Sequence, residues 1–173
     1  MSEFDEHFEL ARIPRLGRDR KLAQFPGSAP IIEYVNGQTY KDDRGGGIGV
    51  ILIGAAPHRL GIFTAMARAL VLHMDGVCYV SLALLEQAIV EDNHPVHEAI
   101  AGSKALFIQG AYDASIPMPL SGYARLQIET FLMERTEDKR RNYYSMSRPM
   151  MQADWWSMDF RGHQHAACRS FEV

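Results

Sequence analysis

An almost unbroken apolar segment in the first third of the chain restricts the fold more than any other feature. Between Gly47 and Gly54 the residues are nearly all aliphatic: Ile48, Val50, Ile51, Leu52 and Ile53. A strand that is apolar on both faces must be buried on both faces, as a central strand of a parallel sheet is. Residues 62–74 then carry apolar side chains at helical spacing. The segment therefore predicts a strand, a loop and a helix in that order.

The same alternation of strand and helix continues to the end of the chain. Further strands are expected at residues 77–80, 105–108, 142–146 and 168–173. Further helices are expected at residues 82–90 and 120–135. This order predicts the α/β class, with a doubly wound, mainly parallel, five-stranded sheet. Ligands of such sheets bind at the carboxyl ends of the strands, so the loops of interest are 54–61, 109–119 and 145–150.

Length and composition are compatible with one globular unit. With 173 residues, of which 47% are hydrophobic, the chain can form a core of its own. Residues 1–37, interrupted by several prolines, are expected to form a lead-in with short helices, and residues 38–173 the α/β domain. A net charge of −3 argues against a basic nucleic-acid coat protein. Two cysteines and the absence of a long apolar run indicate a reducing, cytoplasmic location without a membrane span.

The loop after the first strand has the position of a phosphate-binding loop. Such a loop needs the pattern G-x-x-x-x-G-K-[ST], in which lysine bridges the outer phosphates and the hydroxyl holds magnesium. The corresponding residues are Gly54, Ala55, Ala56, Pro57, His58, Arg59, Leu60 and Gly61. Only the first glycine remains: Arg59 replaces the second glycine, Leu60 the lysine and Gly61 the hydroxyl residue. By itself, the stretch fits an ordinary strand-to-helix turn better than a phosphate loop.

A second ATPase position is also vacant. ATPases of this type end a later apolar strand with an aspartate that holds magnesium and an acid that positions water. The candidate strand, 105–108, is followed by Gln109 and Gly110, and Asp113 lies too far along to replace the acids. Two independent nucleotide motifs therefore lack their chemistry, and no catalytic residue, cofactor or metal is expected.

The order and spacing of these segments resemble the ATPase domain of bacterial and phage replicative-helicase loaders, a branch of the AAA+ superfamily, and the related transposon ATP-binding helpers. The resemblance covers residues 12–173. The segments that carry it are Ile13-Pro14-Arg15, Gly49 to Gly54, Cys78 to Leu85, Ala105 to Asp113, Leu132 to Arg135 and Arg141 to Pro149. Ser147 stands where the family usually has a sensor asparagine. Arg161 lies where such families keep an arginine finger, but that role is not expected here, because no ATP is expected nearby.

The resemblance implies a role beside a hexameric replicative helicase, and the vacant motifs imply that this role does not use ATP. The leading hypothesis is a catalytically inactive, phage-type loader or adaptor that binds the helicase in DNA replication, as a monomer or in an assembly templated by its partner. One alternative is a mimic that inhibits the host loader. A second alternative is a non-standard nucleotide-binding or DNA-binding helper, because His58 and Arg59 stand at a helix N-terminus, where anions are favoured.

Some residues are candidates for contact with the partner. Trp155 and Trp156 are adjacent and cannot both face one core from a regular element, so the segment is either an interface or a lid over the core edge. Arg140 and Arg141 follow a helix end, where a solvated cap is favoured over contact with DNA or an acidic partner. His163, His165 and Cys168 are zinc-ligand types, but a fourth ligand is not evident and a surface turn is favoured over a metal site.

Overall fold

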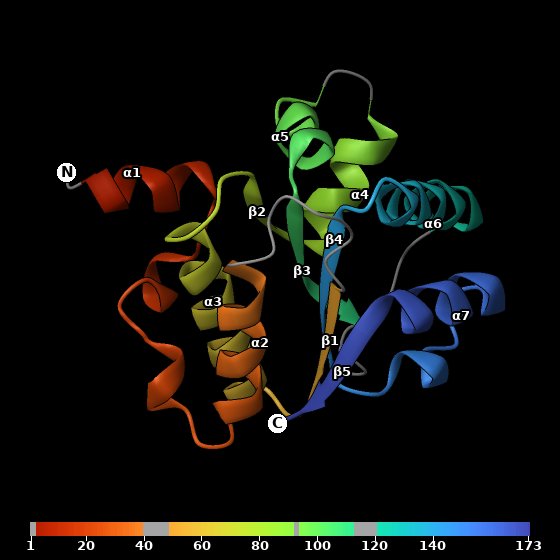
Figure 1. The fold of residues 1–173 in the computed structure, drawn as a ribbon. Helices are drawn as coiled ribbons and strands as arrows, with labels where there is room; N and C mark the ends of the chain where they lie inside the picture. Colours follow the sequence, from red (N-terminus) through yellow and green to blue (C-terminus); the bar gives the residue numbers. More distant parts are fainter. Residues whose placement is uncertain (1–2, 40–48, 92–93, 113–120) are drawn as a thin grey trace.

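The computed structural model describes residues 3–39, 49–91, 94–112 and 121–173 (Figure 1). In chain order its elements are α1 (Glu3–Leu10), the 3-10 turns η1 (Arg15–Gly17) and η2 (Leu22–Gln24), α2 (Ala29–Thr39), β1 (Gly49–Ile53), α3 (His58–Val71), β2 (Val77–Ser81), α4 (Leu82–Val90), α5 (His97–Gly102), β3 (Ala105–Tyr112), α6 (Gly122–Glu137), β4 (Arg141–Met146), η3 (Met150–Gln152), α7 (Met158–Ala167) and β5 (Cys168–Glu172). Among these elements, no helix is long and apolar enough to cross a membrane.

The five strands form one sheet in the order β2-β3-β4-β1-β5. All four neighbouring pairs are parallel, which confirms the predicted fold class. The apolar strand β1 is buried at all five positions, between β4 and β5. Val50 pairs with Tyr143 on one side and with Arg169 on the other. The uninterrupted run of aliphatic residues in β1 is thus explained by neighbours at both edges and helices on both faces.

Helices cover both faces of the sheet, and alternate residues of β1 contribute to two separate cores. Val50 and Leu52 pack with residues of the lead-in, α2 and α3. Ile51 and Ile53 pack with residues of α4, α5, α6 and α7. Figure 1 shows this division, with α2 and α3 on one side of the strands and α4, α6 and α7 on the other. The period of two along a strand places successive side chains in opposite layers.

Aromatic side chains form a row on the α2–α3 face. Phe107 stacks on Tyr143 with ring centroids 4.2 Å apart and an interplanar angle of 4°. Phe63 of α3 meets Phe107 edge-on at 5.1 Å. The hydroxyls of Tyr34 and Tyr143 lie 3.2 Å apart, so α2 is joined to β4 by a buried hydrogen bond. These contacts fix α2 and α3 over the middle of the sheet.

The lead-in packs against the sheet instead of lying apart from it. Phe8, Ile13 and Ile31 are buried in the same core as β1. The Tyr79 N–H of β2 donates to the carbonyl of Ala11 at 2.9 Å. Since β2 is an outer strand, this bond attaches the lead-in to the edge of the sheet. Helix α2 runs to Thr39, two residues beyond the expected end of the lead-in at residue 37.

Several elements differ from the sequence-based expectation. Helix α3 begins at His58 instead of residue 62, and β3 continues to Tyr112 instead of ending at residue 108. Helix α7 was not expected at all, although it occupies the segment that was interpreted as a surface turn. Its end at Ala167 leads directly into β5, so a helix and a strand follow each other without a connecting loop.

A buried arginine joins α5, α6 and β4. Arg135 is 2% exposed, and its guanidinium donates to the carbonyls of Ile100 and Ser103 at 3.1 and 3.0 Å. Its Nε donates to the side-chain oxygen of Asn142 at 3.0 Å. Burial lowers the pKa of Arg135 to about 10. The Arg135 side chain thus caps the end of α5 from inside the protein.

Candidate functional site

The positions at which nucleotide motifs were expected lie at the carboxyl end of the sheet. Ile53 pairs with Met146, and Met146 pairs on its other side with Tyr112 of β3. Gly54 and Ser147 are therefore the next residues of two adjacent strands, and the Gly54 N–H donates to the Met146 carbonyl at 3.2 Å. The two residues are neighbours because the carboxyl ends of adjacent parallel strands lie at the same end of the sheet.

Arg59 occupies the interior of this edge. The residue is 1% exposed although it belongs to the first turn of α3. Its Nε donates to the hydroxyl oxygen of Ser145 at 2.9 Å. Its Nη1 donates to the carbonyl of Gly54 at 2.5 Å. The side chain that replaces the bare glycine of a phosphate loop thus points inward and ties α3 to β4 and to the end of β1.

The backbone of the loop is also engaged with itself. The Arg59 N–H donates to the Ala55 carbonyl at 3.1 Å, and the Gly61 N–H donates to the Pro57 carbonyl at 3.0 Å. Both bonds have helical spacing, so the helical pattern reaches back into the loop. Phosphates bind to helix N-termini through N–H groups that lack such partners. Pro57 supplies no N–H at all, and Leu60 carries no charge.

Two other segments cover the loop from outside. Phe25 of the lead-in meets the His58 ring edge-on, with centroids 6.0 Å apart. Its ring lies so close to Gly61 that a Cβ there would come within 2.6 Å of it. On the other flank, the Val173 N–H donates to the Ile53 carbonyl at 2.9 Å, and a Cβ on Gly54 would overlap the Val173 carbonyl. Both glycines are therefore required for close packing within this chain.

Gln109, at the position of the missing acid, belongs to a short polar chain. Its side-chain oxygen accepts a hydrogen bond from the Tyr79 hydroxyl at 3.0 Å. The same hydroxyl lies 3.3 Å from the hydroxyl of Thr64 in α3. Burial raises the pKa of Tyr79 to about 12, so the phenol stays protonated and donates to the amide at neutral pH. The adjacent Gly110 has φ of 71°, where the register of β3 against β4 shifts.

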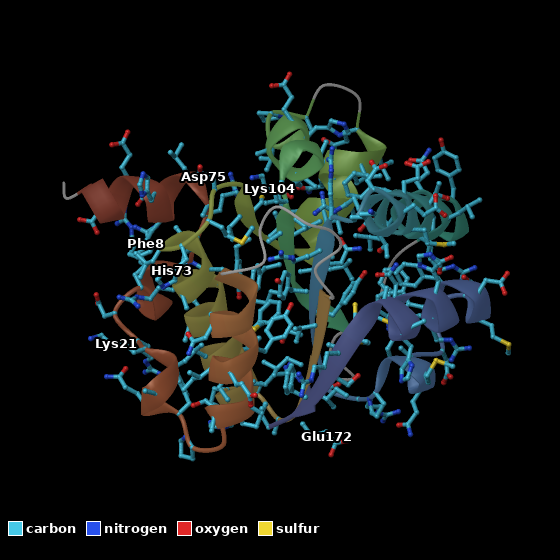
Figure 2. The ribbon with its side chains drawn as sticks, in the orientation of Figure 1. Phe8, Lys21, His73, Asp75, Lys104 and Glu172 are labelled. Carbon is cyan, nitrogen blue, oxygen red and sulfur yellow. The ribbon has the colours of Figure 1, made fainter. Side chains whose placement is uncertain are left out.

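The other residues that the sequence aligned with ATPase positions are Ser147, Asp113 and Arg161. Ser147 is half-buried beside Gly54, and Asp113 lies outside the part that the structure describes. Arg161 donates from Nη1 to the Met151 carbonyl at 2.9 Å and lies 3.9 Å from Asp154. Its guanidinium is thus engaged within its own chain. Glu172 lies at this end of the sheet, paired with Ile53 (Figure 2), but no described group of three or more His, Cys, Asp and Glu side chains could hold a metal ion here.

The residues predicted to contact a partner are less accessible than expected. Trp156 is 1% exposed, and its ring packs on Phe160 at 4.5 Å. Trp155 is half-buried, with its ring 3.9 Å from that of Trp156. The two rings are tilted by 33° against each other, which is possible because both residues lie in a turn before α7 and not in a helix or strand. Whether they contact a partner stays a prediction, and Trp156 offers it almost no surface.

The two arginines of the same prediction are also held by the chain itself. Arg141 is 7% exposed, and Arg140 is half-buried and donates to the Ala101 carbonyl. Because Ala101 is in the last turn of α5, this hydrogen bond holds the turn before β4 against that helix. Contact of either residue with DNA or with an acidic partner remains untested.

The histidines near the end of the chain lie on α7. In the described part of the molecule, no group of three or more His, Cys, Asp and Glu side chains is arranged to hold a metal ion. His163 contacts the side chain of Gln164, with its Nδ1 3.1 Å from the amide nitrogen. The thiol of Cys168 lies inside, 3.7 Å from the Asn142 carbonyl, and burial raises its pKa to about 12.

Sequence reasoning missed the polar residues that complete these contacts. Ser145 and Asn142 are polar positions in the otherwise buried strand β4. Ser145 receives Arg59, and Asn142 receives Arg135. A polar side chain inside a strand that must be buried was the available signal, because such a group needs a hydrogen-bond partner.

No protein-family model and no curated protein sequence matches the chain. Solved structures do match it. The DnaC helicase loader aligns with a TM-score of 0.72 and 10% identity, over 92% of this chain and 99% of that one. DnaI aligns with a TM-score of 0.68 and 12% identity, over 92% and 90%. AMPPCP-bound DnaA from Aquifex aeolicus aligns with a TM-score of 0.70 and 12% identity, over 93% and 51%.

These similarities show the fold. The predicted resemblance to AAA+ helicase loaders is confirmed at this level, since the sheet and its helices match DnaC and DnaI over nearly the whole of both structures. The chain spans about half the length of the DnaA structure.

Proposed function

We propose that this chain is a loader-type protein that binds a replicative DNA helicase in DNA replication and does so without binding or hydrolysing ATP. The loader fold supports the first part of the proposal, because the DnaC helicase loader aligns along 99% of its own structure. The binding surface would be supplied by the fold, and the cytoplasm is where such a partner would be met. A phage is the source we propose, from the family resemblance.

Arg59 is the observation that carries the second part. In a phosphate loop, the outer phosphates need bare backbone, a lysine and free N–H groups. Here a guanidinium hydrogen-bonded to Ser145 and Gly54 fills the inner side of the loop. The Arg59 and Gly61 N–H groups already have partners. Opening this arrangement for a nucleotide would break several buried hydrogen bonds, each of which costs about 1–3 kcal/mol when a group is left without a partner.

A protein that binds no ATP would also assemble differently from its loader relatives. By the family resemblance, loader relatives assemble through ATP held at subunit interfaces. A chain that does not hold ATP would be a monomer or would assemble only on its partner. Partner contacts would then replace the nucleotide as the force that organises the complex.

Titration calorimetry with ATP and ADP, with and without magnesium, tests the nucleotide part. We expect no binding in the micromolar range. Micromolar binding that is lost in Arg59→Ala would contradict the proposal and favour a nucleotide-binding helper, in which His58 and Arg59 receive the anion.

Co-purification with the host helicase, followed by mass measurement of the mixture, tests the partner part. A defined complex with the helicase supports a loader or adaptor. A complex with the host loader instead supports the alternative of an inhibitory mimic. Binding to neither protein contradicts both.

A further inference from the structure

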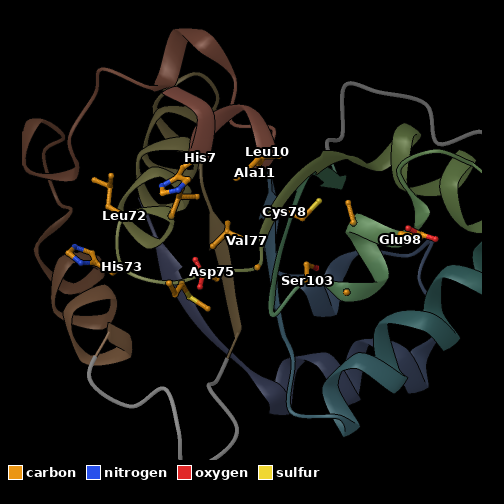
Figure 3. A pocket seen from close by; sticks show the side chains of 15 residues that line it. His7, Leu10, Ala11, Leu72, His73, Asp75, Val77, Cys78, Glu98 and Ser103 are labelled. Carbon is orange, nitrogen blue, oxygen red and sulfur yellow. The ribbon is translucent and has the colours of Figure 1, made fainter. Parts of the chain in front are cut away.

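A cleft lies at the amino ends of the strands, which is the end of the sheet opposite to Gly54 and Ser147. Its volume is about 650 Å³, and it is lined by the end of α1, the end of α3, the start of β2 and residues of α5. Figure 3 shows His7, Leu10 and Ala11 on one side of it and Glu98 and Ser103 on the other. Nothing in the proposed function uses this place, because the amino ends of the strands are remote from the nucleotide edge.

The floor of the cleft is apolar, and one apolar side chain stands at its margin. Leu72, Met74 and Val77 line it, and Leu10 stands at its margin with 71% of its surface exposed. A leucine exposed to that degree beside an apolar depression is a typical component of a protein interface. Leu10 is the last residue of α1, so it is held on a regular element.

The charges in the lining are negative. Asp75 and Glu98 are both exposed, and the lining contains no lysine or arginine. Helix α1 itself contains four carboxylates and no lysine or arginine. Lys104 borders the cleft next to Gly76, and Arg12 follows the lining residue Ala11. A ligand in this cleft would therefore meet an apolar floor with a carboxylate on two of its sides.

The shape favours a segment of a protein over a small molecule. Every wall of the cleft contributes exposed residues. These are His7, Leu10, His73, Asp75, Gly76, Glu98, Ala99 and Gly102. Small-molecule sites enclose most of their ligand, which a cleft with such exposed walls does not do. A second copy of this chain is disfavoured, because a symmetric contact would bring like carboxylates together and the chain carries a net charge of −3.

We propose that this cleft binds a basic amphipathic helix of a partner protein. Leucine-type side chains of that helix would enter between α1 and α5, and its lysines or arginines would pair with Asp75 and Glu98. This is the helix-in-groove mode of recognition, in which apolar anchors supply affinity and flanking charges supply orientation. The proposal holds for any partner with such a helix and does not require that the partner be a helicase.

Fluorescence anisotropy with the full chain tests it. The probe is a labelled synthetic peptide of about 16 residues, with leucines on one helical face and lysines on the other. We expect micromolar binding, and binding weaker by about tenfold or more for Leu10→Ser and for the double variant Asp75→Lys with Glu98→Lys. A peptide with glutamate in place of lysine should bind the double variant better than it binds the unmodified chain. All three substituted residues are exposed, so the fold should persist, and circular dichroism checks this.

Matched controls separate a specific cleft from general charge attraction. Leu126→Ser removes a leucine that is 61% exposed on α6, and Glu134→Lys with Glu137→Lys reverses two exposed carboxylates of the same helix. These variants should bind the peptide as the unmodified chain does. Equal weakening in both sets, no weakening by the cleft variants, or a dimer that Leu10→Ser dissociates would each overturn the proposal. Helicase binding is measured separately, so either result leaves the proposed function open to its own test.

Discussion

At the scale of single residues, Arg59 fills the end of the sheet where a nucleotide-binding loop was expected. A phosphate loop keeps its central positions bare so that ligand oxygens can approach the backbone. In this chain the same space holds a guanidinium with two hydrogen bonds to its own protein. A group that would attract an anion if it were exposed acts here as an internal brace, because its Nε and Nη1 already donate to Ser145 and Gly54.

Replacing Arg59 should therefore reduce stability. We expect Arg59→Ala to lower the free energy of unfolding by about 2–4 kcal/mol, since the Ser145 hydroxyl and the Gly54 carbonyl lose a charged donor and a buried volume is left empty. Urea denaturation followed by circular dichroism measures the change. The control is Arg148→Ala, an exposed position expected to change stability by less than about 0.5 kcal/mol. Equal effects of both substitutions would show that Arg59 is no brace.

At the scale of elements, the docking of α7 rests on one amide. Gln164 is fully buried, and its side-chain oxygen accepts hydrogen bonds from the Tyr144 hydroxyl at 2.7 Å and from the Asn142 amide at 3.3 Å. Its nitrogen donates to the Thr136 hydroxyl at 3.1 Å. One side chain of α7 thus satisfies polar groups of β4 and α6 together.

Gln164→Leu should uncouple these elements. The change keeps most of the volume but leaves the buried Tyr144 hydroxyl without its acceptor, so we expect a loss of about 1–3 kcal/mol of stability. The Asn142 amide keeps the Leu132 carbonyl and the Thr136 hydroxyl as acceptors. Thermal unfolding measures the loss, and hydrogen exchange of α7 shows whether it is local. His165→Leu, an exposed change in the same helix, serves as control. Unchanged stability in Gln164→Leu would mean that apolar packing alone holds α7.

The elements also show how far the sequence could lead. The positions of β1, β2 and β3 followed from apolar runs, because a strand buried on both faces leaves little choice of residue type, whereas β4 and β5 contain polar residues such as Asn142 and Arg169. Helix α7 was missed because its sequence has no apolar stripe. Its middle contains Gly162, His163 and His165, and Gln164, which is buried there, is polar. Gly54 and Ser147, which the sequence assigned to two nucleotide motifs, are neighbours in the structure, and their role as motif positions stays a prediction. The inward turn of Arg59 was not foreseen, because its acceptor Ser145 lies 86 residues away in sequence.

At the scale of the whole molecule, buried phenols and thiols make stability sensitive to alkali. Burial raises the pKa values of six groups: Tyr34, Tyr79, Tyr143, Tyr144, Cys78 and Cys168. For Cys168 the value rises from 9.0 to about 12. Arg135 acts in the opposite direction, since its pKa is lowered to about 10.

The sign of the pH dependence follows from linkage. Between pH 9 and 12 the unfolded chain releases the Cys168 proton and the folded chain keeps it, so the contribution of this group falls as pH rises. Tyr79 behaves likewise between pH 10 and 12, whereas the Arg135 contribution grows above pH 10. The six groups with a raised pKa outnumber the one arginine with a lowered pKa. We therefore expect the urea concentration at the midpoint of unfolding to fall steadily above pH 9. Cys168→Ala should flatten the first part of this fall, and a midpoint constant to pH 10.5 would contradict the explanation.

The bond between the Tyr79 N–H and the Ala11 carbonyl has a consequence for solubility. Outer strands of a sheet can recruit strands of other molecules and so begin aggregation. At β2 the lead-in occupies one such pairing position, and at the other edge β5 exposes Arg169 and Glu172. One edge is thus shielded by the chain's own backbone and the other by charge. In this way a segment that belongs to none of the five strands protects an outer strand from pairing with another molecule.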